Sequence, residues 1–315
     1  MMKEDRKAAV RYKRLIKTVK RQKYLILMIT PFLVWLIIFR YIPISGWITA
    51  FQDYKPRAGM GMFDYPFVGL SHFIKLFQDP MFYLVMRNTL AMSLMQMVFG
   101  FPLPIILAIL LNEVKSIKYK RFVQTCTYLP HFVSWVIVAG IFTTLLSGDG
   151  VVNEILRVTG ILKEPISFLS LPKLFWAICT SAEIWKELGW NSILFLAAIT
   201  SIDPTLYEAA NVDGASRWQA IRHITLPGIS STILVVLVLD IGWMISIGFE
   251  KQYLLSNALV QDYSKVLELY VLDYGIKLGR YSYGTAIGMF TSVVSLVLLF
   301  TANKIAKRWQ GESVL

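Results

Sequence analysis

The sequence has few residues that could form covalent or metal crosslinks, with only two cysteines and three histidines among 315 residues. Cys126 and Cys179 both lie in apolar stretches, where we expect buried, unpaired thiols rather than a disulfide. The histidines are far apart in the sequence, which disfavours a shared metal site: they are His72, His131 and His223.

Three further features are absent from the sequence, and each absence argues against one class of protein or segment. The sequence contains no G-x-x-x-x-G-K-[ST] phosphate loop, so the chain is not expected to hydrolyse a nucleotide itself. It shows no convergent set of nucleophile, base and metal ligands, and an enzymatic role is therefore disfavoured. No Ala-x-Ala-like cleavage site follows the first apolar stretch, which is too long for a cleavable signal. We expect that stretch to be retained as a helix.

Apolar residues are abundant: they make up 56% of the chain, and the mean hydropathy is +0.55. These values exclude an ordinary soluble domain. A helix needs about 20 apolar residues to cross a hydrocarbon core of roughly 30 Å. Six stretches approach that length and predict an all-α membrane protein with six transmembrane helices: residues 24–41, 88–111, 125–146, 174–200, 231–249 and 284–302.

The distribution of basic residues predicts how the chain is oriented in the membrane. With the amino and carboxyl termini in the cytoplasm, the inner segments hold 19 Lys and Arg residues and the outer segments hold 10. Positive residues accumulate on the cytoplasmic side of membrane proteins. Anionic lipid headgroups attract such residues by about 1 kcal/mol each. The net charge of +12 therefore indicates a membrane surface and needs no nucleic acid partner.

The predicted spans divide the chain into four parts. Residues 1–23 form a basic cytoplasmic segment, and residues 24–82 comprise the first transmembrane helix and an outer segment. Residues 83–303 form the core transmembrane domain, and residues 304–315 form a cytoplasmic tail. Pro130, within the third span, predicts a kinked helix, and residues 147–173 are expected to include a small amphipathic helix on the outer face.

Four crossings place residues 201–228 in the cytoplasm. Asp203 and Pro204 suit a helix start, and Gly214 can adopt the positive φ that separates two helices. Residues 204–227, called the elbow below, are therefore predicted to form a helix-turn-helix segment. Its small residues and Trp218 would suit insertion into a groove of a partner. Packing of the elbow only against its own helix bundle is an equally good interpretation of the residues alone.

Residues 208–227 read EAANVDGASRWQAIRHITLP. This stretch resembles the EAA loop of permease subunits in binding-protein-dependent ABC importers, whose pattern is E-A-A, three residues, G, nine residues and I-x-L-P. Every fixed position matches, and Asp213, Gly214 and Ala215 match the version found in sugar importers. Further stretches are similar to permeases of the polysaccharide and multiple-sugar type: FGFPLPIILAILLNEV (residues 99–114), YLPHFVSWVIVAG (residues 128–140) and TAIGMF (residues 285–290).

The resemblance implies a type I ABC importer permease fold in the bacterial plasma membrane, with the elbow seated in a cleft of a cytoplasmic ATPase. It also implies a second homologous permease, forming a heterodimer, two copies of the ATPase, an extracellular solute-binding protein and an oligosaccharide cargo, including polysaccharide-derived or acidic sugars. ATP and Mg²⁺ would bind the ATPase, and this chain would bind no cofactor. The residues that match the coupling segment are Glu208, Ala209, Ala210, Asp213, Gly214, Ala215, Trp218, Ile224, Leu226 and Pro227.

Charged residues within the predicted spans have two interpretations. Glu183, Lys186 and Glu187 share one helical face, and Asp240 lies midway along the fifth span. Such charges should face protein or water, because each costs about 2.5 to 3.5 kcal/mol at the bilayer centre. They could pair structurally, Glu183 with Lys186 in particular. They could instead border a sugar path together with two stacking indoles, in which case the path residues are Glu183, Trp185, Lys186, Glu187, Trp190 and Asp240.

A second functional class stays open at this stage. An ion-coupled secondary transporter could use Glu183, Glu187 and Asp240 as proton or ion sites. That alternative leaves the elbow without a role.

Overall fold

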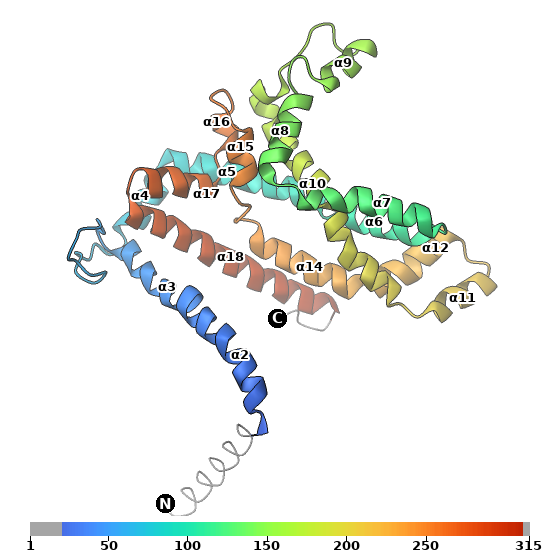
Figure 1. The fold of residues 1–315 in the computed structure, drawn as a ribbon, viewed down its shortest axis with the longest axis horizontal. Helices are drawn as coiled ribbons and strands as arrows, with labels where there is room; N and C mark the ends of the chain where they lie inside the picture. Colours follow the sequence, from blue (N-terminus) through green and yellow to red (C-terminus); the bar gives the residue numbers. More distant parts are fainter. Residues whose placement is uncertain (1–20, 311–315) are drawn as a thin grey trace, which may run out of the picture. The chain divides into compact units, whose positions relative to one another are not determined.

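The structure is a computed structural model that describes residues 21–310, and its regular elements are helical apart from one isolated β-bridge (Figure 1). The chain divides into two compact units, one up to Ser71 and one from His72 onward. The α-helices are α2 (Lys23–Leu36), α3 (Ile42–Ile44), α4 (Ser71–Gln78), α5 (Pro80–Met95), α6 (Pro102–Glu113), α7 (Ile117–Tyr128), α8 (Trp135–Leu145), α9 (Val151–Val158), α10 (Phe175–Thr200), α11 (Pro204–Val212), α12 (Arg217–Ala220), α13 (Leu226–Gly228), α14 (Ser230–Trp243), α15 (Glu250–Leu255), α16 (Gln261–Ser264), α17 (Leu267–Tyr270) and α18 (Tyr281–Gln310).

The first unit consists of one long helical stretch and a loop. Residues Lys23–Phe51 run through α2 and α3 with π-helical and 3₁₀ turns between and after them. None of the most apolar part of this stretch is buried by other residues of the described range 21–310. A helix that is apolar all round suits a lipid environment. The loop folds back through a bridge between Gln52 and Phe67, and the rings of Tyr54 and Tyr65 meet edge-on with centroids 4.6 Å apart.

Three helical segments are long and apolar enough to cross a membrane without a break: Lys23–Phe51, Pro80–Glu113 and Tyr281–Arg308. Three bent helix pairs also meet the criterion, so the described residues contain up to six spans if each bent pair counts as one. The unbroken segments contain the first, second and sixth apolar stretches. By length and composition the structure is compatible with six spans, while the number of spans and their sidedness stay predictions.

The third predicted span is not one kinked helix. Its two arms, Ile117–Phe132 and Trp135–Leu145, meet at 106°. Pro130 lies in the short 3₁₀ turn Leu129–Phe132. The two residues after this turn, Val133 and Ser134, have extended backbones with ψ of 134° and 152°. The expectation of a kink at Pro130 was therefore incomplete. Two consecutive residues with non-helical backbone dihedrals break the helix and turn the chain by 106°.

Several element boundaries and one burial assignment also differ from the prediction. Helix α5 begins at Pro80, eight residues before the predicted second span, because Asp79 caps it by accepting a hydrogen bond from Met81 N. Helix α14 ends at Trp243, whereas the predicted fifth span continued to residue 249. Cys179 is buried as expected, but Cys126 is exposed on α7, and both thiols are free.

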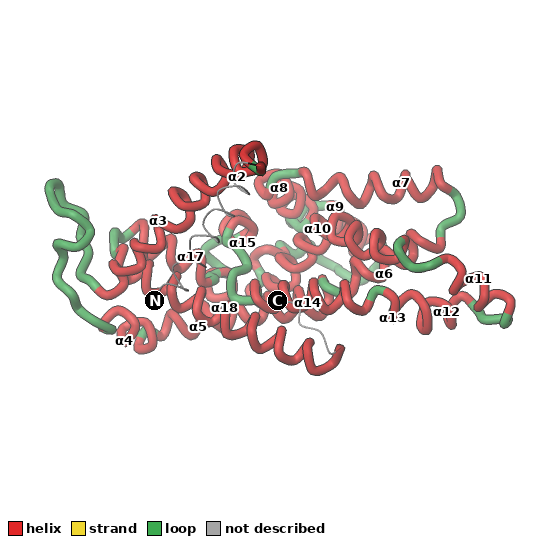
Figure 2. The backbone as a smooth tube through the Cα atoms, turned by 90° about the horizontal axis from the view of Figure 1, so that it is seen from below, coloured by secondary structure: helices red, strands yellow, loops and turns green. Residues whose placement is uncertain are grey.

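The second unit is a helix bundle with polar connections to the segments that follow α14. Helices α14 and α18 run side by side in both views, and α10 packs against α6 (Figures 1 and 2). Asn88 of α5 is fully buried, and its amide nitrogen donates to the carbonyl oxygens of Asp262 and Lys265 at 3.0 and 2.9 Å. These bonds tie α5 to the segment around α16, so the loops after α14 are fixed to the bundle.

Candidate functional site

The elbow begins with the predicted helix cap. The Asp203 carboxylate accepts a hydrogen bond from Thr205 N at 2.9 Å, and Pro204 occupies the first turn of α11. Both features satisfy or remove backbone donors that would otherwise lack a partner at a helix start. The sequence therefore fixes the start of α11 directly after the long helix α10.

Gly214 forms the turn between the two helices of the elbow. Its φ is +74°, in the left-handed region predicted for this position. The N–H of Ala215 donates to the carbonyl of Ala210 at 2.9 Å, and Gly214 N donates to Asn211 O at 3.2 Å. This pair of bonds is a Schellman motif, which ends a helix and redirects the chain.

The second helix of the elbow starts with a capping box. Ser216 accepts from Gln219 N, and the Gln219 side chain accepts from Ser216 N at 2.7 Å. A hydrogen bond of 2.9 Å joins Tyr207 Oη on α11 to Thr225 Oγ1 in the π-helical turn Ile221–Thr225. The two arms of the elbow are therefore held together by side chains as well as by the turn.

The elbow lies at one end of the second unit (Figure 2), and two of its apolar side chains are largely exposed. The exposed fraction is 88% for Val212 and 67% for Trp218. Exposed apolar groups of this size, set around a small-residue turn, are typical of interaction sites. Six of the ten residues assigned to coupling are exposed and four are partly buried; the partly buried ones are Ala210, Ala215, Ile224 and Leu226.

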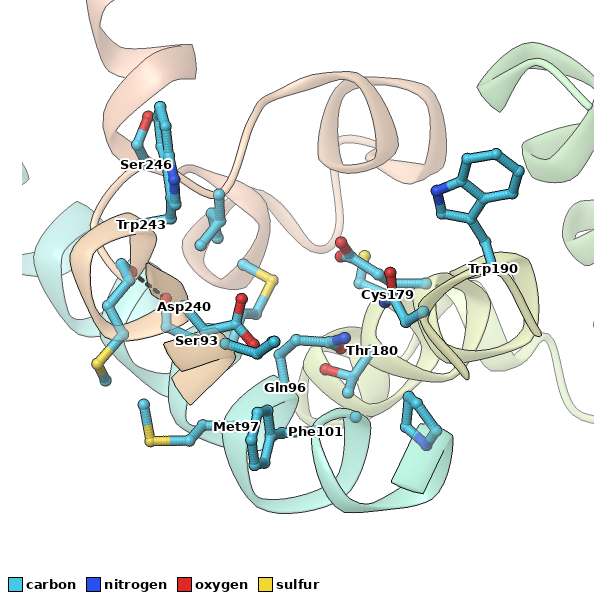
Figure 3. A pocket seen from close by; sticks show the side chains of 18 of the residues that line it. Ser93, Gln96, Met97, Phe101, Cys179, Thr180, Trp190, Asp240, Trp243 and Ser246 are labelled. Atoms are coloured by element: carbon cyan, nitrogen blue, oxygen red, sulfur yellow. Dashed lines mark hydrogen bonds between the residues drawn. The ribbon is translucent and has the colours of Figure 1, made fainter. Parts of the chain in front are cut away.

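A cavity of about 460 Å³ lies within the helix bundle of the second unit. Its wall comes from α5, α6, α10 and α14, from the segments between α5 and α6 and after α14, and from α15 (Figure 3). The lining combines aromatic, thioether and polar side chains, which is the usual composition of a small-molecule site. The polar and aromatic members include Ser93, Gln96, Phe101, Thr180, Glu183, Trp190, Asn191, Asp240, Trp243, Ser246 and Lys251.

The structure brings three of the six predicted path residues into this wall, namely Glu183, Trp190 and Asp240. The other three lie elsewhere. Trp185, on a different side of α10, contacts the ring of Phe142 edge-on at 6.1 Å, and Lys186 and Glu187 bind the turn before α8.

Sequence reasoning missed Lys251 and most of the uncharged polar lining. Gln96, Ser93 and Asn191 each interrupt an apolar stretch, and that interruption was a signal that could have singled them out. Lys251 gave no such signal, because it lies in a polar segment that was expected to be an outer loop.

The charge pairing differs from the structural pairing that we considered. Glu183 pairs with Lys251, not with Lys186, and Lys186 pairs with Glu187 at 3.1 Å. Lys251 belongs to α15, which follows the fifth apolar helix, so only the tertiary fold brings it to Glu183. Burial lowers the pKa of Lys251 to about 8, although the nearby Cys179 and Glu268 act in the opposite direction.

Asp240 differs from Glu183 because its carboxylate has no charged partner among the described residues. Its carboxylate lines the wall and makes no hydrogen bond or ion pair with any other residue in the described part of the chain. The side-chain oxygen of Gln96 is also buried without a hydrogen-bond partner among the residues described. The Asp240 carboxylate can accept hydrogen bonds from hydroxyl groups of a ligand in the cavity. Within residues 21–310 no group of three or more His, Cys, Asp or Glu side chains is placed to hold a metal ion.

The elbow is connected covalently to two walls of the cavity. Helix α10 carries Glu183 and runs directly into the elbow, and α14, which carries Asp240, follows it. At about 1.5 Å per residue, Glu183 lies about 26 Å from the end of α10, and Asp240 about 15 Å from the start of α14. A displacement of the elbow can therefore be transmitted to the cavity by two helices.

Comparison with known proteins identifies the relatives of this chain. Residues 100–311 match the model of the family described as "Binding-protein-dependent transport system inner membrane component". The polygalacturonan/rhamnogalacturonan transport system permease protein YteP of Bacillus subtilis is 45% identical over 303 residues, which are 96% of this chain and 93% of that protein. The arabinooligosaccharides transport system permease protein AraP of the same organism is 30% identical, over 90% of this chain and 88% of the relative.

Solved structures show the same fold. A chain of a bacterial ABC transporter involved in the import of the acidic polysaccharide alginate superimposes with a TM-score of 0.86 at 43% identity, covering 94% of this chain and 99% of the other. A second structure, the bacterial alginate ABC transporter in complex with an alginate pentasaccharide-bound periplasmic protein, gives a TM-score of 0.86 at 42% identity, covering 95% and 99%.

Proposed function

Because the chain belongs to the family of inner-membrane components of binding-protein-dependent transport systems and is a permease subunit of an ABC sugar importer, we propose that its elbow couples ATP hydrolysis on a separate ATPase to oligosaccharide import across the bacterial plasma membrane. The family assignment leaves the ion-coupled alternative without support.

One observation carries this proposal: the elbow exposes Val212 and Trp218 while it joins α10 and α14, two of the helices that line the cavity. A surface that only packed against its own bundle would bury these side chains. The ATPase supplies the nucleotide chemistry, since the sequence contains no phosphate loop. Closure of the ATPases moves the seated elbows, and α10 and α14 carry this motion to the cavity.

The cargo is an oligosaccharide released from a polysaccharide, and acidic sugars belong to this class. Two features support this assignment. The named relatives include permeases for polygalacturonan/rhamnogalacturonan and for arabinooligosaccharides, and the alginate transporter is a structural neighbour. The cavity also offers indole surfaces and unpaired polar groups, which suit the apolar faces and hydroxyl groups of sugars.

The assembly contains further subunits. A second homologous permease completes the translocation path as a heterodimer, two copies of the ATPase bind the elbows, and an extracellular binding protein delivers the sugar. The structure of the bacterial alginate transporter contains an alginate pentasaccharide-bound periplasmic protein, which supports this assembly. The docking surface for the binding protein on this chain is formed by exposed residues within 147–173 and 250–283, the segments expected on the outer side. Co-purification with the tagged chain identifies these partners.

Gly214→Val tests the coupling role. A β-branched residue at a φ of +74° costs about 1 to 2 kcal/mol and distorts the turn, so we expect normal insertion in the membrane but loss of sugar uptake. Gly59→Val is the matched control, because Gly59 has a φ of +83° and, like Gly214, has no other atom within 4 Å of the position that a Cβ would occupy. Full uptake by the Gly214 variant would show that the elbow is not the coupling element.

A further inference from the structure

One aromatic side chain of the cavity wall is held in a fixed plane by two others. The imidazole of His131 stacks flat on the indole of Trp190, with ring centroids 4.2 Å apart and planes 2° apart. The ring of Phe132 meets the same indole edge-on, at 5.7 Å and 83°. His131 and Phe132 come from the 3₁₀ turn Leu129–Phe132, and Trp190 comes from α10. The two contacts together restrict rotation of the indole.

Charged groups on α10 hold His131 in turn. Its Nδ1 lies 2.7 Å from Oε2 of Glu187. The ammonium of Lys186 donates to the backbone carbonyl of His131 at 2.5 Å and lies 3.1 Å from Oε1 of Glu187. Lys186 is only 6% exposed, and its ammonium lies 5.8 Å from the ring centroid of Trp135 at the start of α8. The imidazole is therefore fixed through both its ring and its backbone.

Trp190 connects this charged cluster to the cavity. Lys186, Glu187 and His131 do not line the cavity, whereas Trp190 does and remains 42% exposed. In Figure 3, Trp190 stands on one side of the cavity, and Asp240 and Trp243 stand on the other. A buried ion pair contributes little net stability. Its structural consequence here is the orientation of one half-exposed aromatic surface.

We infer that Trp190 is the stacking surface for a sugar ring and that His131 is a positioning residue, which holds the indole at the angle that this stacking requires. The inference rests on the proposed function, because it takes an oligosaccharide as the cargo. The C–H face of a sugar ring packs against an indole by dispersion and burial of apolar area. An indole that is already fixed loses less side-chain entropy when the sugar binds.

The test uses the assembled importer, with its ATPase and binding protein, in proteoliposomes. The measured quantity is the concentration of trigalacturonate or arabinotriose that half-maximally stimulates ATP hydrolysis. Trp190→Leu should raise this concentration about tenfold, the loss expected for one aromatic contact. Trp185→Leu is the matched control: Trp185 is also on α10 and also 42% exposed, but it lies outside the cavity wall. Its value should stay within about twofold of the wild type.

The positioning role of His131 gives a separate result. His131→Ala should also raise the half-saturating concentration, and His131→Phe, which keeps a flat ring against Trp190, should recover most of that loss. In the Trp190→Leu background, His131→Ala should have no further effect, because both act through one contact. An unchanged value for Trp190→Leu, or additive effects of the two substitutions, would overturn the inference.

Two further results separate a failure of the proposed cargo from a failure of the positioning role of His131. If neither trisaccharide stimulates the wild-type assembly, the proposed cargo is wrong and the inference fails with it, before any variant is compared. Labelling with 5-fluorotryptophan tests the geometry without transport: the fluorine resonance that disappears in Trp190→Leu should shift in His131→Ala. An unshifted resonance would overturn the positioning role even in a variant that transports poorly.

Discussion

Replacement of Trp218 by alanine tests the elbow as an interface in quantitative terms. The side chain is 67% exposed, so its loss removes little packing within the chain. If the partner covers the exposed part, about two thirds of roughly 250 Å² of aromatic residue surface becomes buried. At about 25 cal/mol per Å², this burial corresponds to about 4 kcal/mol as an upper limit.

The expected loss in affinity is smaller than that limit, because association also costs side-chain and rigid-body entropy. Aromatic residues at the centre of an interface typically contribute about 2 to 4 kcal/mol. Since about 1.4 kcal/mol is a factor of ten, we expect the dissociation constant between permease and ATPase to rise by roughly 30-fold to 1,000-fold.

The assay titrates purified ATPase into the permease pair in lipid nanodiscs and measures the dissociation constant together with sugar uptake in cells. Trp35→Ala is the control, since Trp35 is 52% exposed on α2, in the other compact unit. It should leave the dissociation constant unchanged. Equal affinity of the Trp218 variant and the wild type would refute the argument that this exposed indole is an interface residue.

Two further substitutions test the cavity and the bundle. Asp240→Asn should change sugar-stimulated ATP hydrolysis, because it removes a carboxylate that faces the cavity without a partner; unchanged stimulation and uptake would rule out a role in the path. Gly189→Ala should lower the thermal unfolding midpoint of the solubilised protein by several degrees, at a cost of about 1 to 3 kcal/mol, since its methyl group would overlap the carbonyl oxygen of Thr127. Gly140→Ala, also helical, has open space around a Cβ and should change the midpoint by less than a degree or two; equal midpoints for both variants would contradict the packing argument.

Local signals predicted the elbow well. A cap at Asp203, a proline in the first helical turn and a glycine with positive φ are properties of a few neighbouring residues, and all three appear in the structure. Hydropathy also predicted where the apolar helices lie along the chain, because it depends only on the local composition of the sequence. The 106° break after Pro130 was underestimated, since nothing in the local sequence required both Val133 and Ser134 to be extended.

The sequence by itself therefore determined the class of protein: its apolar lengths, the absence of a phosphate loop and the complete EAA pattern are readable without coordinates. Only the tertiary structure decided which charges meet. Lys251 pairs with Glu183 across 68 residues of chain, and Lys186 turns instead to Glu187 and the backbone of His131. Helical spacing limits the neighbours within one helix. Pairing between helices depends on how the bundle packs, and packing is set by many weak contacts distributed along the whole chain.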